Sequence, residues 1–382
     1  MSKTTISATI DHSTNIVPTH AELRKKRIEL SPQFHQGRVI NRMPHVPSPQ
    51  SKRQFVWSYL GGRKQLQPQV TLPYQARQKS DFSHPSQSLQ VTWLGHSTMW
   101  VEIDGISVLT DPVFSYASPK VAKPWFERNV STPIQREDLP VPKVVLISHD
   151  HYDHLEKTTI EYYRDTDTHF IVPLGVGKYL QRWGVKPTRI EELDWWQETQ
   201  YQGVTLACTP ANHNSGRYGW DSNSTLWASW VLIGKRERFY FSGDSAYDKH
   251  FAEIGLRYGP FDIAAIEVAA DVKKDRGYCV ENCGHMQASH TVRAALDLDA
   301  KKLLPIHWAT FELFTHQWDE PINDLCRVAL LQSQAILTPM IGEKVHSQSA
   351  NLKKWWLQPE LQARPVKRSR WRSPAMMKAG KV

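Results

Sequence analysis

The chain has 382 residues, of which 40% are hydrophobic and 22% are charged. This composition excludes a wholly disordered chain. The sequence contains no apolar run near the ~20 residues of a membrane-spanning helix, and residues 1–15 lack the apolar stretch of a secretory signal. Four cysteines are too few for a disulfide scaffold, so a reducing, cytoplasmic location is expected.

The net charge of +9 is unevenly distributed along the chain. Residues 1–90 hold 13 basic and 4 acidic side chains, and residues 351–382 hold nine basic and one acidic. Residues 91–350 are therefore acidic, with 25 basic and 33 acidic side chains. An acidic centre favours cation ligation, and basic ends favour an anionic surface outside the protein.

Three regions are predicted from the local pattern. Residues 1–88 are rich in proline and poor in periodicity, which predicts an extended basic arm with short helices at most, anchored by the apolar segment 55–60. Residues 89–345 are expected to form the main domain. Residues 346–382 are polar, basic and proline-containing, and they predict a basic C-terminal tail.

Regular structure is predicted from Leu89 onward. Asp104–Gly105 predicts a hairpin turn between strands at 99–103 and 106–109, and the apolar run 144–147 predicts a strand buried on both faces. Strands that alternate with helices predict an α/β layered domain. The remaining predicted strands lie at 91–93, 170–172, 204–208, 226–233, 239–241, 263–266 and 303–306, and the helices at 155–164, 176–183, 246–257 and 287–297.

The loop after the buried strand carries three histidines and a carboxylate that can bind metal: His149, His151, Asp153 and His154. In extended backbone, His149 and His151 point to the same side, while Asp153 and His154 begin the next turn and approach from another direction. The loop can therefore bind two adjacent ions, and its donors suit Zn²⁺, Mn²⁺ or Fe²⁺. The alternative is a solvated polar loop.

Three more candidate ligands follow predicted strands. They are His213, Asp244 and His307. Taken singly, Asp244 could be a helix N-cap and the histidines ordinary buried residues. Because all three recur in the same structural context, a shared metal centre is favoured.

This set of residues resembles the pattern of the metallo-β-lactamase superfamily, which implies an αββα sandwich with two metal ions between its sheets. The motifs at 93–98, 109–114, 251–255, 258–262 and 305–311 resemble the branch that contains N-acylphosphatidylethanolamine-hydrolysing phospholipase D and its bacterial relatives. The resemblance covers about residues 88–330.

The resemblance implies a role for each candidate. Two Zn²⁺ ions are expected per chain, and Asp111 would accept a ligand N–H from behind the centre unless it is an ordinary turn residue. His149, His151 and His213 would hold the first ion, Asp153, His154 and His307 the second, and Asp244 would bridge them.

The implied reaction is a phospholipase D-type cleavage of N-acyl phosphatidylethanolamine to N-acylethanolamine and phosphatidic acid by a metal-bridging hydroxide. Asp153 is expected to act as general base. His285 would contact phosphate or protonate the leaving group, unless it is a surface residue at a helix start. Two alternatives stay open: a lactonase acting on a sugar phosphate, and a non-enzymatic metal-binding regulatory protein.

Other residues receive weaker predictions. His96 could line the site but stays outside the ligand set, and His250, His290 and His316 are expected at the surface. Cys279 and Cys283 could form a separate zinc clip, although no second cysteine pair lies nearby.

The expected partners are a phospholipid or another phosphodiester substrate, and no nucleic acid, while no oligomeric state is predicted. In the C-terminal tail, Trp355, Trp356 and Trp371 alternate with basic residues. This pattern predicts peripheral contact with the inner face of an anionic membrane; the alternative is a solvated tail.

Overall fold

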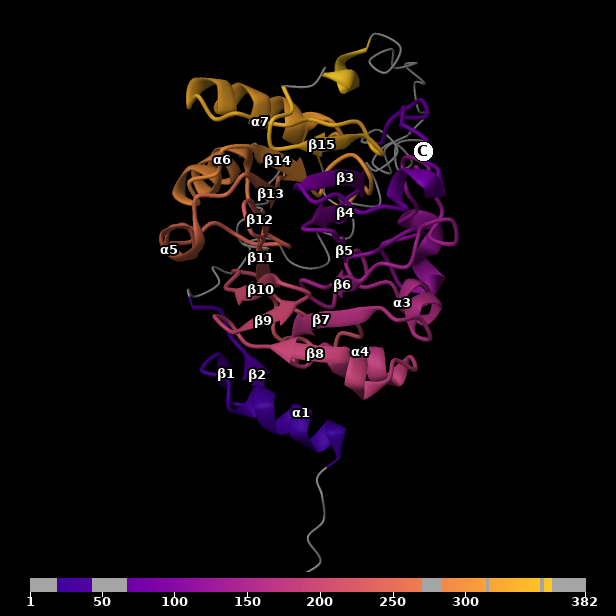
Figure 1. Cartoon of the computed structure of the whole chain (residues 1–382), viewed down its shortest axis with the longest axis vertical. Helices are drawn as coiled ribbons and strands as arrows, with labels where there is room; N and C mark the ends of the chain where they lie inside the picture. The colour runs from indigo at the N-terminus through magenta and orange to yellow at the C-terminus, as the bar shows by residue number, and fades with distance from the viewer. Residues whose placement is uncertain (1–18, 43–66, 270–283, 314–315, 351–353, 359–382) are drawn as a thin grey trace, which may run out of the picture.

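The computed structural model describes residues 19–42, 67–269, 284–313, 316–350 and 354–358. Two mixed sheets pack face to face with helices on their outer faces (Figure 1). This confirms the predicted αββα sandwich. The predicted anchor at 55–60, the Cys279–Cys283 pair and Trp371 lie outside the described residues.

The first sheet has seven strands. β4 and β5 are antiparallel, with Ile103 opposite Ile106, which confirms the hairpin turn at Asp104–Gly105. From β5 to β8 the strands are parallel. In spatial order the strands are β15 (Lys344–His346), β3 (Gln90–Gly95), β4 (Thr98–Ile103), β5 (Ile106–Thr110), β6 (Val144–Leu146), β7 (His169–Pro173) and β8 (Ile190–Leu193).

The second sheet has six strands. Pro305 lies in its outermost strand, β14, where the missing N–H costs no hydrogen bond within the sheet. Strands β12, β13 and β14 are parallel. The spatial order is β14 (Leu303–Ile306), β13 (Ile263–Glu267), β12 (Arg238–Phe241), β11 (Ser229–Ile233), β10 (Val204–Thr209) and β9 (Glu198–Tyr201).

Strand β6 is buried on both faces, as its apolar run predicts. Val144 and Leu146 join the core between the two sheets, whereas Val145 and Ile147 join a second core beneath α3 (Lys157–Tyr163) and α4 (Gly177–Arg182). Each such side chain stabilises the fold by about 1.5–3 kcal/mol. The loop that follows β6 is therefore fixed by packing on two sides.

Three helices cover the outer face of the six-stranded sheet (Figure 1). They are α5 (His250–Tyr258), α6 (Ala288–Asp297) and α7 (Glu320–Leu331). The sequence predicts α6 closely, predicts the start of α5 four residues too early, and misses α7. Within the described part of the chain, no helix is both long and apolar enough to cross a bilayer.

Part of the predicted N-terminal arm is folded against the sandwich. Thr19 caps α1 (His20–Glu29), and a short hairpin of β1 (Phe34–His35) and β2 (Arg38–Val39) follows. Arg24 of α1 lies 2.6 Å from Glu192 of β8. This segment is thus a helix and hairpin attached to the first sheet.

The start of the predicted C-terminal tail is also buried. Trp355 and Trp356 are 3% and 0% exposed, and Trp355 stacks on Trp308 with ring centroids 5.4 Å apart. Trp356 donates its indole N–H to Asn323 at 2.8 Å. The prediction that these two tryptophans face a membrane is wrong, because both complete the core beside β14.

Candidate metal centre

The structure brings all seven predicted ligands to one place between the sheets. Each follows the carboxyl end of a strand, and in this fold those ends meet at one edge of the sandwich. His149, His151, Asp153 and His154 follow β6, His213 follows β10, Asp244 follows β12 and His307 follows β14.

Three histidines form the first cluster, in which the candidate ligand atoms lie within 4.8 Å of one another. Nδ1 of His151 is 2.9 Å from Nε2 of His149 and 3.2 Å from Nε2 of His213. Nδ1 of His213 faces the carbonyl oxygen of Gly284 at 2.9 Å, and a carbonyl can only accept. The proton of neutral His213 is therefore on Nδ1, and its Nε2 lone pair faces the cluster.

Asp111 fixes the orientation of two further imidazoles. Its carboxylate is completely buried and accepts the hydroxyl of Ser148 at 2.5 Å and Nδ1–H of His154 at 2.7 Å. Since Ser148 donates to Asp111, its oxygen accepts from Nδ1–H of His149, 2.9 Å away. Both His149 and His154 thus direct an Nε2 lone pair into the centre, the arrangement that a carboxylate behind metal-binding histidines produces.

His154 faces two carboxylates. Its Nε2 lies 3.0 Å from Oδ2 of Asp244 and 3.2 Å from Oδ2 of Asp153. Burial lowers the pKa of His154, but Asp244 and Asp153 together raise it well above its ordinary value. An imidazole lone pair that points at two carboxylates needs a positive charge between them, which a divalent cation supplies.

Asp244 lies between the two clusters. Its Oδ2 is 3.3 Å from Nε2 of His307 on one side, and 3.7 and 3.8 Å from Nε2 of His213 and His149 on the other. Oδ1 of Asp244 is buried without a hydrogen-bond partner among the described residues. Burial acts to raise the pKa of Asp244, but His154 and His307 hold it well below its usual range. The carboxylate is therefore ionised and placed to contact ions in both clusters.

His96 is more central than the sequence indicates. It is fully buried, and its Nε2 lies 3.0 Å from Oδ2 of Asp153. Burial and the neighbouring His307 lower the pKa of His96 to about 3, so the ring is neutral. His96 therefore donates to Asp153 and groups with the second cluster, made of Asp153, His154 and His307.

His285 is held by a carboxylate that sequence analysis misses. Its Nδ1 lies 3.0 Å from Oε2 of Glu267, a completely buried residue that ends β13. His285 is 8% exposed, so the alternative of a surface residue is wrong. Its ring centroid is 5.1 Å from those of His213 and His307. A glutamate that ends an otherwise apolar strand was the available sequence signal.

Arg217 braces the metal-binding loop from outside. Its Nη1 donates to the carbonyls of Asp150 and Leu155 at 2.7 and 2.8 Å, and its guanidinium lies 4.0 Å from the ring of Tyr152. Asp150 accepts a hydrogen bond from Thr225 at 3.0 Å. No local pattern in the sequence indicates this contact, which joins the loop to the segment after β10.

The three histidines expected at the surface do not belong to the two ligand clusters. His250 is 1% exposed and packs on Phe251, so the prediction of a surface position is wrong for it. His290 and His316 are half-buried.

The donor set fits two divalent ions. Imidazole nitrogens and ionised carboxylates converge in two buried groups with Asp244 between them. Imidazole and carboxylate are donors that Zn²⁺ and several other transition metals accept. These buried His and Asp clusters are consistent with a dinuclear metal site.

Comparison with known proteins identifies the class. A model of the "Beta-lactamase superfamily domain" matches residues 107–308. The chain belongs to this metallo-β-lactamase superfamily of metal-dependent hydrolases.

Two relatives in sequence are informative. An uncharacterized protein of Mycobacterium tuberculosis is 37% identical over 344 residues, covering 86% of this chain and 88% of its own. The N-acyl-phosphatidylethanolamine-hydrolyzing phospholipase D 1 of Caenorhabditis elegans is 32% identical over 265 residues, covering 65% of this chain and 71% of its own.

A solved structure supports the fold. The isothiocyanate hydrolase from Delia radicum gut bacteria aligns with a TM-score of 0.53 at 18% identity, over 67% of this chain and 98% of that one. At this identity the likeness concerns the sandwich alone.

Proposed function

We propose that the chain is a dinuclear zinc phosphodiesterase of the phospholipase D type, which cleaves N-acyl phosphatidylethanolamine to N-acylethanolamine and phosphatidic acid. The observation that carries the proposal is the position of Asp244 within reach of both histidine clusters. The 32% identity to the Caenorhabditis elegans phospholipase D supports the choice of substrate.

In this proposal the two clusters hold one ion each. His149, His151 and His213 would hold the first, Asp153, His154 and His307 the second, and Asp244 would contact both. Two bound divalent ions lower the pKa of water and neutralise charge on a phosphoryl group.

Asp153 serves as the proton acceptor. Burial acts to raise its pKa, but His154, His307 and His96 hold it well below its usual range, so Asp153 is ionised at neutral pH. The side chain of Asp153 is 13% exposed, whereas that of Asp244 is 2% exposed. His96 occupies Oδ2 of Asp153, and Oδ1 is therefore the oxygen that takes the proton from water.

His285 serves the substrate side. Glu267 accepts Nδ1–H of His285, and we assign the contact with substrate to Nε2. A proton on Nε2 would be donated to a phosphoryl oxygen or to the departing alkoxide. Glu267 acts by orienting this ring and does not touch substrate.

In the decisive experiment, zinc-loaded full-length protein is incubated with N-acyl phosphatidylethanolamine and, separately, with a sugar-phosphate lactone. The products are identified by mass spectrometry. Release of phosphatidic acid supports the proposal. Ring opening without phosphatidic acid would replace it with a lactonase, and no turnover of either would favour a regulatory metal-binding protein.

Two variants make the comparison specific. Asp244→Ala should lose at least one ion and all turnover. Asp165→Asn removes a carboxylate whose side chain is 77% exposed, and it should change neither. Product formed equally by both variants would show that a contaminant is responsible.

A further inference from the structure

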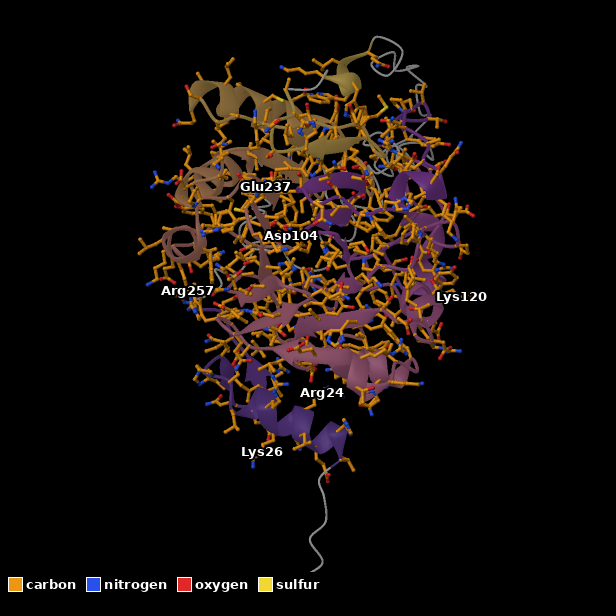
Figure 2. The ribbon with its side chains drawn as sticks, viewed as in Figure 1. Arg24, Lys26, Asp104, Lys120, Glu237 and Arg257 are labelled. Carbon is orange, nitrogen blue, oxygen red and sulfur yellow. The ribbon has the colours of Figure 1, made fainter. Side chains whose placement is uncertain are left out.

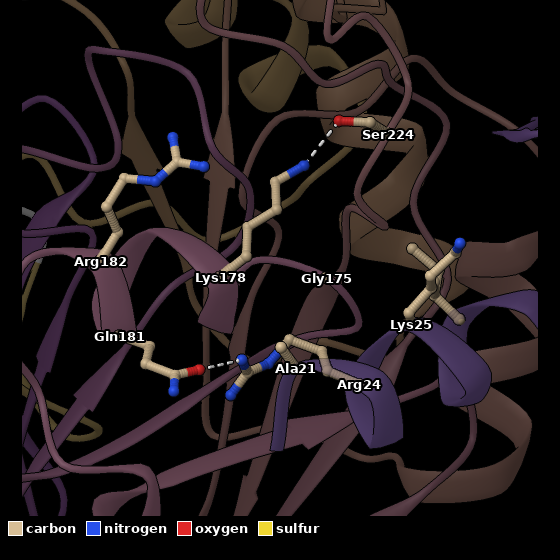
Figure 3. A pocket seen from close by; sticks show the side chains of 9 residues that line it. Ala21, Arg24, Lys25, Gly175, Lys178, Gln181, Arg182 and Ser224 are labelled. Atoms are coloured by element: carbon tan, nitrogen blue, oxygen red, sulfur yellow. Dashed lines mark hydrogen bonds between the residues drawn. The ribbon is translucent and has the colours of Figure 1, made fainter. Parts of the chain in front are cut away.

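A cavity of about 460 Å³ lies between α1 and α4 (Figure 3). Its volume is in the range of small-molecule sites, about 300–1,000 Å³. Gly175 and Ser224 form part of its wall, and no residue of the metal centre lines it. Four cationic side chains surround it: Arg24, Lys25, Lys178 and Arg182.

One of the four cations is already neutralised. Arg24 donates Nε to Glu192 at 2.6 Å and Nη1 to Gln181 at 2.7 Å. Glu192 also accepts the backbone N–H groups of Gly175 and Gly177, each at 2.9 Å. This buried ion pair attaches α1 to β8 beside the cavity.

The other three cations lack a short ion pair of the kind that Arg24 makes. Lys178 donates to the neutral hydroxyl of Ser224 at 2.7 Å and lies 4.8 Å from the ring of Tyr179. Among the described residues, neither Lys178 nor Arg182 has a carboxylate within 4 Å, and Lys25 has only Glu29 at 3.9 Å. Burial lowers the pKa of Lys178, while the carboxylates of Asp150, Asp221 and Glu192, all beyond 4 Å, act to raise it.

We infer that this cavity is a binding site for a phosphate group, as the free ion or as a monoester. A phosphate monoester carries a charge of about −1.5 to −2 near neutral pH, which matches several convergent cations better than a single carboxylate does. The guanidinium of Arg182 offers paired donors and Lys178 a point charge, the two usual partners of phosphate. Ala21 and Ile28 line the cavity beside them and leave an apolar wall for an organic substituent.

The inference is independent of the proposed reaction. A lipid headgroup such as phosphatidic acid and a soluble ester such as glycerol 3-phosphate present the same chemical group. The experiment therefore tests both sources.

In the first experiment, inorganic phosphate and glycerol 3-phosphate are titrated into zinc-loaded full-length protein. Calorimetry measures the affinity, and backbone hydrogen exchange locates the site. We expect protection of α1 and α4. Arg182→Gln, at an exposed side chain, should weaken binding about tenfold or more, because each charge-assisted hydrogen bond contributes strongly. Lys178→Gln should act in the same direction while it preserves a hydrogen bond to Ser224.

The control is Lys26→Gln, which also removes one positive charge but does so on α1, the other helix beside the cavity. Lys26 does not line the cavity and lies on the far side of α1 from the sheets, whereas Arg24 faces them (Figure 2). The control should bind within twofold of the parent. An equal loss in Lys26→Gln and Arg182→Gln would overturn the inference, because net charge alone would then explain it.

Phosphate can also bind at the metal centre, and hydrogen exchange separates the two sites. Protection confined to residues 148–155 and 209–216, with α1 and α4 unchanged, would overturn the inference even if calorimetry detects binding. Failure of the proposed phospholipase reaction would leave this result untouched.

The second experiment uses vesicles of phosphatidylcholine with and without phosphatidic acid. Binding that requires phosphatidic acid, falls in Arg182→Gln and is competed by glycerol 3-phosphate identifies a lipid headgroup as a ligand. Binding of the soluble esters alone identifies a soluble ligand. No Arg182-dependent binding in either experiment would refute the site.

Discussion

Oδ2 of Asp111 lies 2.7 Å from Nδ1 of His154, and the same oxygen accepts the hydroxyl of Ser148. One buried carboxylate thereby determines which nitrogen of two different histidines faces the metal centre. The pairing joins residues 43 positions apart in the chain.

Asp111→Asn should therefore weaken metal binding without removing a ligand. The amide can donate toward Nδ1 of His154 and thus favour the wrong tautomer. We expect a loss of about 10–100-fold in zinc affinity, typical of changes behind metal ligands. Competition with a fluorescent chelator measures it, and Asp165→Asn is the matched control. An unchanged zinc affinity would show that the orientation of His149 and His154 does not depend on Asp111.

Asp153→Asn should abolish most turnover while the first ion stays bound. The amide oxygen cannot accept the proton of water, whereas His149, His151 and His213 are unaltered. We expect kcat to fall by about 10²–10⁴-fold, as for other general-base variants. Turnover assays combined with metal analysis test this, and full activity in the variant would contradict the assigned role.

Glu267→Gln should lower kcat more than it raises KM. Glu267 accepts Ser245 N–H at Oε1 and Nδ1–H of His285 at Oε2, whereas a glutamine has only one acceptor oxygen. The amide keeps the size of the side chain but cannot keep both contacts, so the ring of His285 is held less firmly. A decrease of about tenfold or more is expected, with both ions retained. A His285→Ala background gives the control, because the effect of Glu267→Gln should then largely disappear. Equal effects in both backgrounds would show that Glu267 acts through the fold.

Removal of zinc should destabilise the protein. Without the ions, the buried carboxylates of Asp153 and Asp244 lose the divalent charge that would bind them to the surrounding imidazoles. Ligand binding at about 1,000 times Kd stabilises the folded state by roughly 4 kcal/mol, so a chelator should lower Tm by several degrees. Zinc occupancy should also fall as the pH falls, since protons compete for the ligating imidazoles. Calorimetry with and without chelator measures the first effect, and an unchanged Tm would count against a filled centre.

Trp356→Ala should destabilise the fold although the residue lies near the C-terminus. The side chain is completely buried and donates to Asn323. Truncation of a buried Trp typically costs about 3–5 kcal/mol. Leu357→Ala, at a side chain that is 46% exposed, is the control. The free energies of unfolding of the two variants are compared by urea denaturation. For the same reason, a shortened protein used to test membrane binding should end after residue 358, so that the core remains intact.

The sequence predicts the centre of the fold better than its margins. The run 144–147 is buried by its own apolar side chains, so its position could be predicted locally. Strands β8 and β9 were not predicted because they carry glutamates and other polar residues. Burial of Glu192 depends on partners outside β8, among them Arg24, which is 168 residues away in the chain.

The same limit applies to the site. The spacing of His149, His151, Asp153 and His154 is readable because one loop holds them. The contact of His96 with Asp153 spans 57 residues and depends on how two strands align. Burial of Trp355 likewise depends on Trp308, which no local pattern reveals.

Helix α1 has a consequence for self-association. Strand β8 ends the seven-stranded sheet and pairs only with β7, so its other side is an open edge. Arg27 of α1 donates to the backbone carbonyl of Glu192 at that edge, and Arg24 covers the same residue. Exposed edges recruit strands from other molecules. A chain lacking residues 1–42 would therefore retain its metal ligands and yet present an uncovered strand, and it should aggregate through β8 as its concentration rises.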